Sequence, residues 1–175
     1  MPEGRVWPPE WRTYRDRRTH VEVRQLTDYK AHSYHLYFTN PGWYAGGRKL
    51  LFGSDRENRC NLFGLDLHSG EIRQLTDIGP AGGGEPNFQV TCLNPQRDEA
   101  YFCHAGKLLA LDLGVLKSRT IYELPQRFRS SMLNCTADGR CVCLGFVEDL
   151  SERIHLDLGR GYIGFNESFE ARPLC

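Results

Sequence analysis

One short segment of this chain occurs twice. Val23–Asp28 reads VRQLTD and Ile72–Asp77 reads IRQLTD, so the two copies differ only at their first residue. A second pair of similar segments, Leu50–Phe52 and Ala100–Phe102, shows nearly the same separation of about 50 residues. Each unit of a repeat protein buries its apolar faces against its neighbours. The period therefore predicts an architecture of stacked, similar units.

The content of one unit predicts β-strands. Lys49–Phe52 and Cys60–Leu67 are short apolar segments, and a third strand is expected at Glu71–Leu75. Gly70 supplies the positive φ of the hairpin turn that precedes this third strand. The next unit repeats the order, with strands expected at 100–104, 107–113 and 119–124. A period of about 40–50 residues with such strands predicts an all-β fold of β-propeller blades, with units ending near Asp77 and Leu124.

The chain divides into a short N-terminal segment and the repeats. Residues 1–20 contain Pro2, Pro8 and Pro9, which disfavour regular structure, so we expect an extended arm there. Residues 21–175 are expected to form blades, and residues 159–162 favour an inserted loop. Propellers have about 4–8 blades, and this chain supplies about three to four. We therefore favour an incomplete arc, truncated at its C-terminus, over a small closed propeller, for which no closing strand is evident.

Composition and charge exclude several classes of partner. Lys plus Arg and Asp plus Glu both number 22, so the basic excess that nucleic-acid binding needs is missing. No apolar run approaches the length of about 18 residues that indicates a membrane span. The N-terminus shows no secretory signal, so we expect a cytoplasmic protein. Unburied blade faces at the two ends of an arc predict self-association.

The segment His35–Asn40 is the first candidate binding site. If it is a strand, alternation places His35, Tyr37 and Thr39 on one face. The innermost strand of a propeller blade lines the central channel, where a histidine can act as a base or a ligand. The alternative is a blade strand in which these side chains satisfy nearby backbone groups.

Arg56 is the second candidate. Its planar guanidinium matches a carboxylate with two parallel hydrogen bonds, which suits an acidic ligand. The alternative is a turn within the blade, in which Asp55 and Asn58 bond the backbone.

No metal site is predicted within this chain. The six histidines are scattered, and only His32 and His35 lie close together. Their spacing directs them to opposite faces of a strand, which is poor geometry for joint ligation. Motifs of serine hydrolases, zinc peptidases and EF-hands do not occur either.

Several of these segments resemble one known family. The lead-in WPPEWR and the segments HLYFTN, KLLFGSDR, NLFGLDL and QLTD, which lie between residues 7 and 77, look like the opening of oligogalacturonate lyases. The unit from SDR to QLT also resembles TolB-type propellers and the propellers of prolyl-oligopeptidase-like peptidases. The segment His35–Asn40, just before this unit, favours the lyase family.

The resemblance implies a seven-bladed propeller that cleaves oligogalacturonides by β-elimination. It implies a divalent metal, typically manganese, bound by His and Gln residues in the C-terminal half of the family's chains, and a histidine base. No segment of this chain matches those ligands, so the chain is expected to hold substrate contacts, with His35 and Arg56 as the residues concerned, and to be inactive by itself. The alternative is a non-catalytic, TolB- or WD40-like propeller segment that binds a protein or another ligand.

Overall fold

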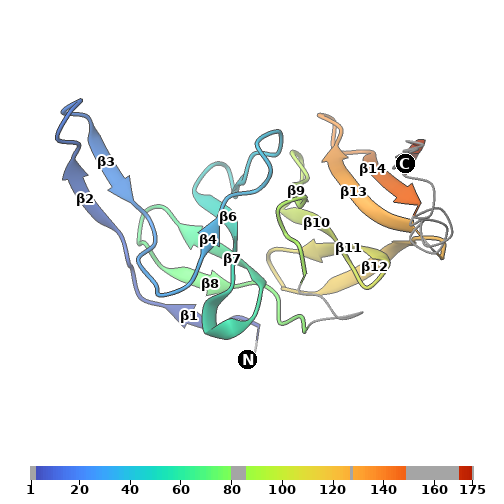
Figure 1. Cartoon of the computed structure of the whole chain (residues 1–175), viewed down its shortest axis with the longest axis horizontal. Coiled ribbons are helices and arrows are strands. Elements are labelled where there is room, and N and C mark those ends of the chain that lie inside the picture. Colours follow the sequence, from blue (N-terminus) through green and yellow to red (C-terminus); the bar gives the residue numbers. More distant parts are fainter. Residues whose placement is uncertain (1–2, 80–85, 127, 149–169, 175) are drawn as a thin grey trace, which may run out of the picture.

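The computed structural model describes residues 3–79, 86–126, 128–148 and 170–174. These residues form strands and turns with one short 3-10 helix, η1 (Arg56–Asn58), and no α-helix among them. Three sheets lie side by side along the molecule, with a separate two-stranded hairpin next to the first (Figure 1). The expected all-β arc of propeller blades is thereby confirmed. None of these residues belongs to a helix with the length and hydropathy that crossing a membrane requires.

The first sheet is built around two buried central strands. Its order is β1-β8-β7-β6-β4, and β5 also pairs with β6. The strands are β1 Val6–Trp7, β4 Ser33–Tyr34, β5 Trp43–Tyr44, β6 Lys49–Ser54, β7 Asn61–Asp66 and β8 Ile72–Gln74. Between β7 and β8, Asp66 accepts hydrogen bonds from the N–H groups of His68 and Ser69, and Gly70 adopts a φ of 79°. This is the hairpin turn that the sequence predicts, and β8 ends close to Asp77.

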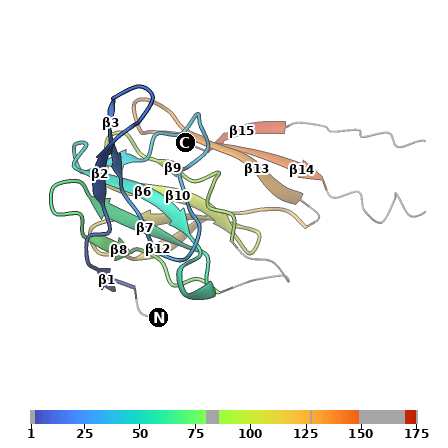
Figure 2. The same cartoon turned by 60° about the vertical axis from the view of Figure 1, so that its left-hand side comes forward.

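The second and third sheets follow along the chain. The second sheet has the order β12-β11-β10-β9, with β9 Cys92–Leu93, β10 Glu99–His104, β11 Lys107–Asp112 and β12 Ser118–Glu123. It ends next to Leu124, as the repeat predicts. The third contains β13 Phe128–Cys135, β14 Val142–Glu148 and β15 Glu170–Leu174, which lie side by side in Figure 2. The loop expected at 159–162 lies outside the described residues.

The apolar core lies between neighbouring sheets. Leu51 and Leu62 of the first sheet form one buried cluster with Phe102 and Leu111 of the second. A second cluster joins the second and third sheets, with Tyr101, Leu108, Leu133, Leu144 and Phe146 among its members. Each fully buried side chain of this size stabilises the fold by about 1.5–3 kcal/mol relative to exposure. The sheets are therefore held together by apolar packing, as the blades of a propeller are.

The N-terminal segment contributes to two different sheets. β1 pairs with β8, where Trp7 lies opposite Ile72, so the first blade gains its outermost strand from the start of the chain. β2 Arg12–Arg15 pairs with β3 Glu22–Gln25 in the separate hairpin. The expected boundary between an arm (1–20) and the blades (21–175) thus falls inside this hairpin. Trp7 is buried and packs edge-on against Phe63, with 5.4 Å between ring centroids.

Candidate functional site

The innermost strand of the first sheet is interrupted. β4 pairs with the end of β6, where Tyr34 lies opposite Gly53, while β5 pairs with its beginning, where Trp43 lies opposite Leu50. Residues 35–42 between them leave the sheet and form what we call the inner loop. The expected strand His35–Asn40, with His35, Tyr37 and Thr39 on one face, is therefore wrong. Leu36 and Asn40 are buried instead, and anchor the loop to other parts of the fold.

Asn40 ties the inner loop to both other sheets. Its side chain is 3% exposed, and its amide Nδ2 donates to the carbonyl oxygens of Thr91 (3.1 Å) and Leu133 (2.9 Å). Thr91 precedes β9, and Leu133 belongs to β13. The backbone N–H of Tyr37 also donates to the carbonyl of Gln89 at 2.6 Å. The loop is thus fixed where the inner edges of the three sheets meet.

Gly42 lets the chain return to the sheet. The N–H of Leu51 donates to the carbonyl of Gly42 at 2.7 Å, and a Cβ on this glycine would lie only 2.7 Å from the carbonyl oxygen of Leu51. Real Cβ atoms do not approach that closely. The backbone approach that closes the loop therefore requires glycine at this position.

The exposed side chains of the inner loop are His35, Tyr37, Phe38, Thr39 and Pro41. The Nδ1–H of His35 donates to the carbonyl of Leu36 at 3.0 Å, and Nε2 lies beside Gly42, where an added Cβ would be 3.0 Å from it. Tyr37 is 37% exposed and Phe38 is 83% exposed, with their ring centroids 4.4 Å apart. The loop thus offers solvent one imidazole and a pair of aromatic rings.

Arg56, the second candidate from the sequence, is buried and bonds a side chain of the protein itself. It is 2% exposed, and its guanidinium donates from Nη1 and Nη2 to the two carboxylate oxygens of Glu10, at 2.5 and 2.9 Å. The guanidinium carbon also lies 4.8 Å from the centre of the Tyr29 ring and 5.6 Å from that of Phe63. The arginine does hold a carboxylate with two hydrogen bonds, but that carboxylate belongs to the N-terminal segment.

The charge of Glu10 is stabilised in this position. Burial by itself would raise the pKa of Glu10, but the hydrogen bonds from Arg56 and from the N–H of Asp28 outweigh it, so the pKa lies below its usual value. Glu10 is therefore ionised at neutral pH. Its pair with Arg56 joins the N-terminal segment to η1 of the first blade.

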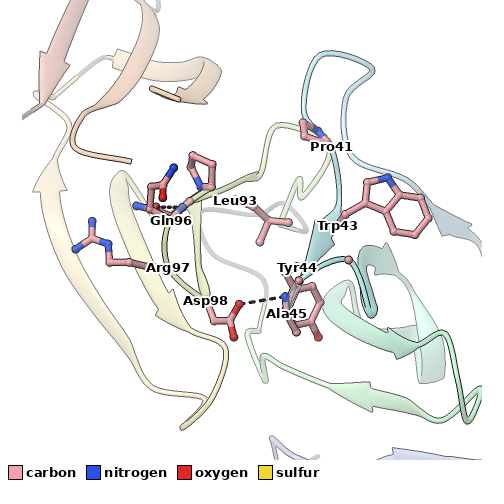
Figure 3. Close-up of a pocket in the computed structure, with 12 residues that line it drawn as sticks. Pro41, Trp43, Tyr44, Ala45, Leu93, Gln96, Arg97 and Asp98 are labelled. Atoms are coloured by element: carbon pink, nitrogen blue, oxygen red, sulfur yellow. Dashed lines mark hydrogen bonds between the residues drawn. The ribbon is translucent and has the colours of Figure 1, made fainter. Parts of the chain in front are cut away.

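A groove of about 560 Å³ lies between the first two sheets (Figure 3). It runs between the β5–β6 turn and the β9–β10 turn, which are joined by a hydrogen bond of 3.1 Å from the N–H of Ala45 to Asp98. In Figure 3 the side chains of Trp43 and Arg97 lie on opposite sides and point away from each other. Arg97 instead donates to the carbonyl of Gly139 at 3.2 Å. The groove thus lacks converging polar side chains of the kind that fix a small ligand.

A polar network connects the second and third sheets. Glu99 accepts a hydrogen bond from Tyr101 at 2.6 Å and another from Arg119, while Asn94 donates to Tyr101 and to the carbonyl of Gly139, both at 2.9 Å. Burial would raise the pKa of Glu99, but these donors lower it below the usual value. The polar groups of this network bond one another, which indicates a structural role.

The sequence reasoning missed Phe38 and Asn40. Asn-Pro is a turn signal, and Asn40-Pro41-Gly42 could have indicated that the strand ends there. Nothing in the sequence indicates that Asn40 reaches two other sheets, since those contacts join residues far apart in the chain.

The described residues do not form a metal site. Across 3–79, 86–126, 128–148 and 170–174, no group of three or more His, Cys, Asp or Glu side chains could hold a metal ion. The described part of the chain thus offers no set of side chains that fits manganese.

Comparison with known proteins places this chain in one family. The sequence profile of the oligogalacturonate lyase family matches residues 1–175. An oligogalacturonide lyase of Pectobacterium atrosepticum is 32% identical over 126 residues, which are 71% of this chain and 31% of that protein. A solved oligogalacturonate lyase in complex with manganese is 25% identical, with a TM-score of 0.75 over 85% of this chain and 39% of the other.

The match covers only part of the related lyases, and a protein outside the family shares the fold. The chain spans about a third of the length of the curated relatives it matches. A putative TolB from Agrobacterium tumefaciens has a TM-score of 0.52 over 71% of this chain and 41% of that one, at 15% identity, which shows a shared fold alone. The profile match over every residue, together with the sequence identity to the lyases, favours the lyases over TolB-like proteins. The chain belongs to the oligogalacturonate lyase family.

Proposed function

We propose that the protein carrying this chain cleaves oligogalacturonides by β-elimination in the degradation of pectin. The observation that carries this proposal is the match of the family profile to residues 1–175. The relatives' names supply the substrate class. The cytoplasmic location and the self-association expected from the sequence stay predictions.

The reaction itself has simple requirements. A base removes the proton on C5 of a galacturonate ring, the electron pair forms a C4–C5 double bond, and the glycosidic oxygen on C4 leaves with the electrons of its bond. The barrier falls only if base, substrate carboxylate and charge-stabilising groups are held together in one site. Because one family member is solved with manganese, we propose that the whole protein also uses a divalent metal. The described residues of this chain contain no group of side chains that could hold that ion.

This chain is proposed to contribute substrate contacts. His35 is exposed on the inner loop, and because Nδ1 donates to the carbonyl of Leu36, Nε2 of the neutral ring can accept a hydrogen bond from a hydroxyl group of the sugar. Arg56 is unsuited to that task because its two terminal nitrogens already bond Glu10. We therefore assign substrate binding to His35 and a structural role to Arg56.

The test compares the complete gene product with the 175-residue chain. Each is incubated with digalacturonate and a manganese salt, and the unsaturated product is followed by its ultraviolet absorbance. Metal-dependent turnover by the complete protein, and none by the chain alone, is expected. Absence of turnover in the complete protein would favour the alternative of a non-catalytic, TolB-like binding propeller. Turnover by the chain alone would place the base and the metal ligands within these residues.

A further inference from the structure

The exposed aromatic pair of the inner loop has no structural explanation within the described fold. Phe38 is 83% exposed, more than any other large hydrophobic residue in the described part of the chain. Tyr37 lies against it, with the two ring centroids 4.4 Å apart. Exposed apolar side chains are common, but most stand singly on strands or at loose turns. Here two adjacent rings form the tip of a firmly anchored loop.

The loop that carries the pair is rigidly held. Asn40, directly after the turn, bonds the second and third sheets through its side chain, and the N–H of Tyr37 bonds Gln89. Leu36, directly before the pair, is 4% exposed and belongs to the apolar core. A ring that is fixed before a ligand arrives loses little conformational entropy on binding, which is the advantage of a preorganised contact surface.

The pair also lies where a propeller binds its ligands. β9 and β13 are the inner edge strands of their sheets and contact one another, and Asn40 bonds residues in or next to both. The inner loop is thus at the convergence of the inner edges, toward the centre of the arc (Figure 1). Inner edges of blades face the central channel, in which propellers hold ligands.

We propose that Phe38, supported by Tyr37, is a stacking platform for one pyranose ring of an oligogalacturonide. This inference rests on the proposed function. In a galacturonate ring the hydrogens on C3, C4 and C5 share one face, which gives the sugar an apolar patch that an aromatic ring can cover. Stacking on that face would shield the C5 proton from a base, which must come within hydrogen-bonding reach of it. The platform therefore holds a ring next to the one that reacts.

A neighbouring ring contributes binding energy equally before and during the reaction. Removing such a contact raises KM and leaves kcat nearly unchanged. In the complete gene product, Phe38→Ala should raise KM for trigalacturonate about threefold to tenfold, the worth of one aromatic contact, with kcat within about twofold. Phe38→Trp should retain the KM of the parent protein, since it keeps a ring at this position.

The matched control is Val115→Ala, which truncates another exposed apolar residue, 66% exposed, in the turn after β11. It should change neither KM nor kcat. The thermal unfolding of each variant is also measured. Phe38→Ala should keep the Tm of the parent protein to within about 2 °C, because an exposed ring contributes little to stability.

Three outcomes would overturn the proposal. An unchanged KM in Phe38→Ala, with the parent protein active, would remove the platform and leave the lyase function intact. A large fall in Tm for Phe38→Ala would show that the ring packs inside the complete protein. A parent protein that neither cleaves nor binds trigalacturonate, measured by calorimetry without metal, would refute the proposed function and the platform's ligand together.

Discussion

Glu10 binds the guanidinium of Arg56 with both carboxylate oxygens, at 2.5 and 2.9 Å, inside the first blade. The side chains are 13% and 0% exposed, respectively. Glu10 follows β1, which is the outermost strand of the blade, and Arg56 begins the turn between β6 and β7. The pair therefore fixes the path of the N-terminal segment across the blade. An arginine that suits an acidic ligand by its chemistry is used here to hold the protein's own carboxylate.

Replacing Arg56 should destabilise the fold. Arg56→Ala leaves Glu10 charged and largely buried without its partner, and breaking a buried pair in this way costs about 3–5 kcal/mol. We expect a decrease of about 3 kcal/mol in the free energy of unfolding, measured by urea denaturation. Arg59→Ala is the control, since Arg59 is half exposed in its pair with Asp77 and such pairs contribute about 0–1 kcal/mol.

The same variants separate the two roles considered for Arg56. A structural role predicts that Arg56→Ala lowers stability and that any loss of activity follows the folded fraction. If instead Arg56→Ala is as stable as Arg59→Ala while kcat/KM falls by an order of magnitude, the substrate role expected from the sequence is correct.

Acidification should weaken the ion pair of Glu10 with Arg56, because the carboxylate of Glu10 takes up a proton. The pKa of Glu10 is lowered in the folded protein, so its ionised form stabilises the fold above the unfolded pKa of about 4.5. That contribution is lost as the pH falls from about 4.5 through the lower folded value, where the native carboxylate takes up a proton. Unfolding free energies measured from pH 7 to pH 3 should fall less steeply in Glu10→Gln than in the parent. Identical slopes would show that other carboxylates dominate the acid response.

The repeat in the sequence predicted the blades because it reports local structure. VRQLTD and IRQLTD nevertheless play different roles. Ile72–Gln74 is β8 of the first blade, whereas Glu22–Gln25 is β3 of the separate hairpin. The same residues form a strand in both places, because strand formation follows local alternation and turns, but the pairing partner depends on the rest of the chain. Sequence similarity thus identified strands more reliably than their sheets.

The candidate site was less predictable because long-range contacts decide it. Alternation predicted a continuous strand through His35, but the side chain of Asn40 satisfies two carbonyls that lie 51 and 93 residues further along the chain, and this holds the segment out of the sheet. The pair of Arg56 with Glu10 likewise spans 46 residues. The chemistry of each residue was foreseeable, whereas its partner was not.

Gly139 should resist substitution for a reason beyond its backbone conformation. Its φ is 68°, and a Cβ there would lie 2.4 Å from Oδ1 of Asn94, within the network that joins the second and third sheets. Gly139→Ala should lower the free energy of unfolding by about 2–5 kcal/mol, from backbone strain of about 1–2 kcal/mol and overpacking of about 1–3 kcal/mol.

Gly106→Ala is the matched control for this prediction. Gly106 has a φ of 71° in the β10–β11 turn, with no atom within 4 Å of an added Cβ. It should therefore show the backbone strain alone. Equal losses in the two variants, measured by urea denaturation, would mean that the contact with Asn94 relaxes without cost.

The last prediction concerns Asn40, on which the position of the inner loop depends. Asn40→Asp keeps the shape of the side chain but replaces the donating amide with a second oxygen, which faces the carbonyls of Thr91 and Leu133. Both carbonyls lose their donor, and each unsatisfied buried group costs about 1–3 kcal/mol. We expect the free energy of unfolding to fall by about 2–4 kcal/mol and the amide of Tyr37 to exchange faster with solvent hydrogen.

Asn87→Asp provides the comparison for this variant. Asn87 is exposed and uses its Oδ1, an atom that aspartate retains, to accept from the N–H of Gln89 at 3.0 Å. The same chemical change there should alter stability by less than about 0.5 kcal/mol, as is usual for surface substitutions. If both variants are equally stable, Asn40 does not anchor the loop. If only Asn40→Asp loosens the loop and also raises KM for trigalacturonate, the rigidity of the loop supports substrate binding, because a mobile aromatic pair must be ordered before it can hold a sugar ring.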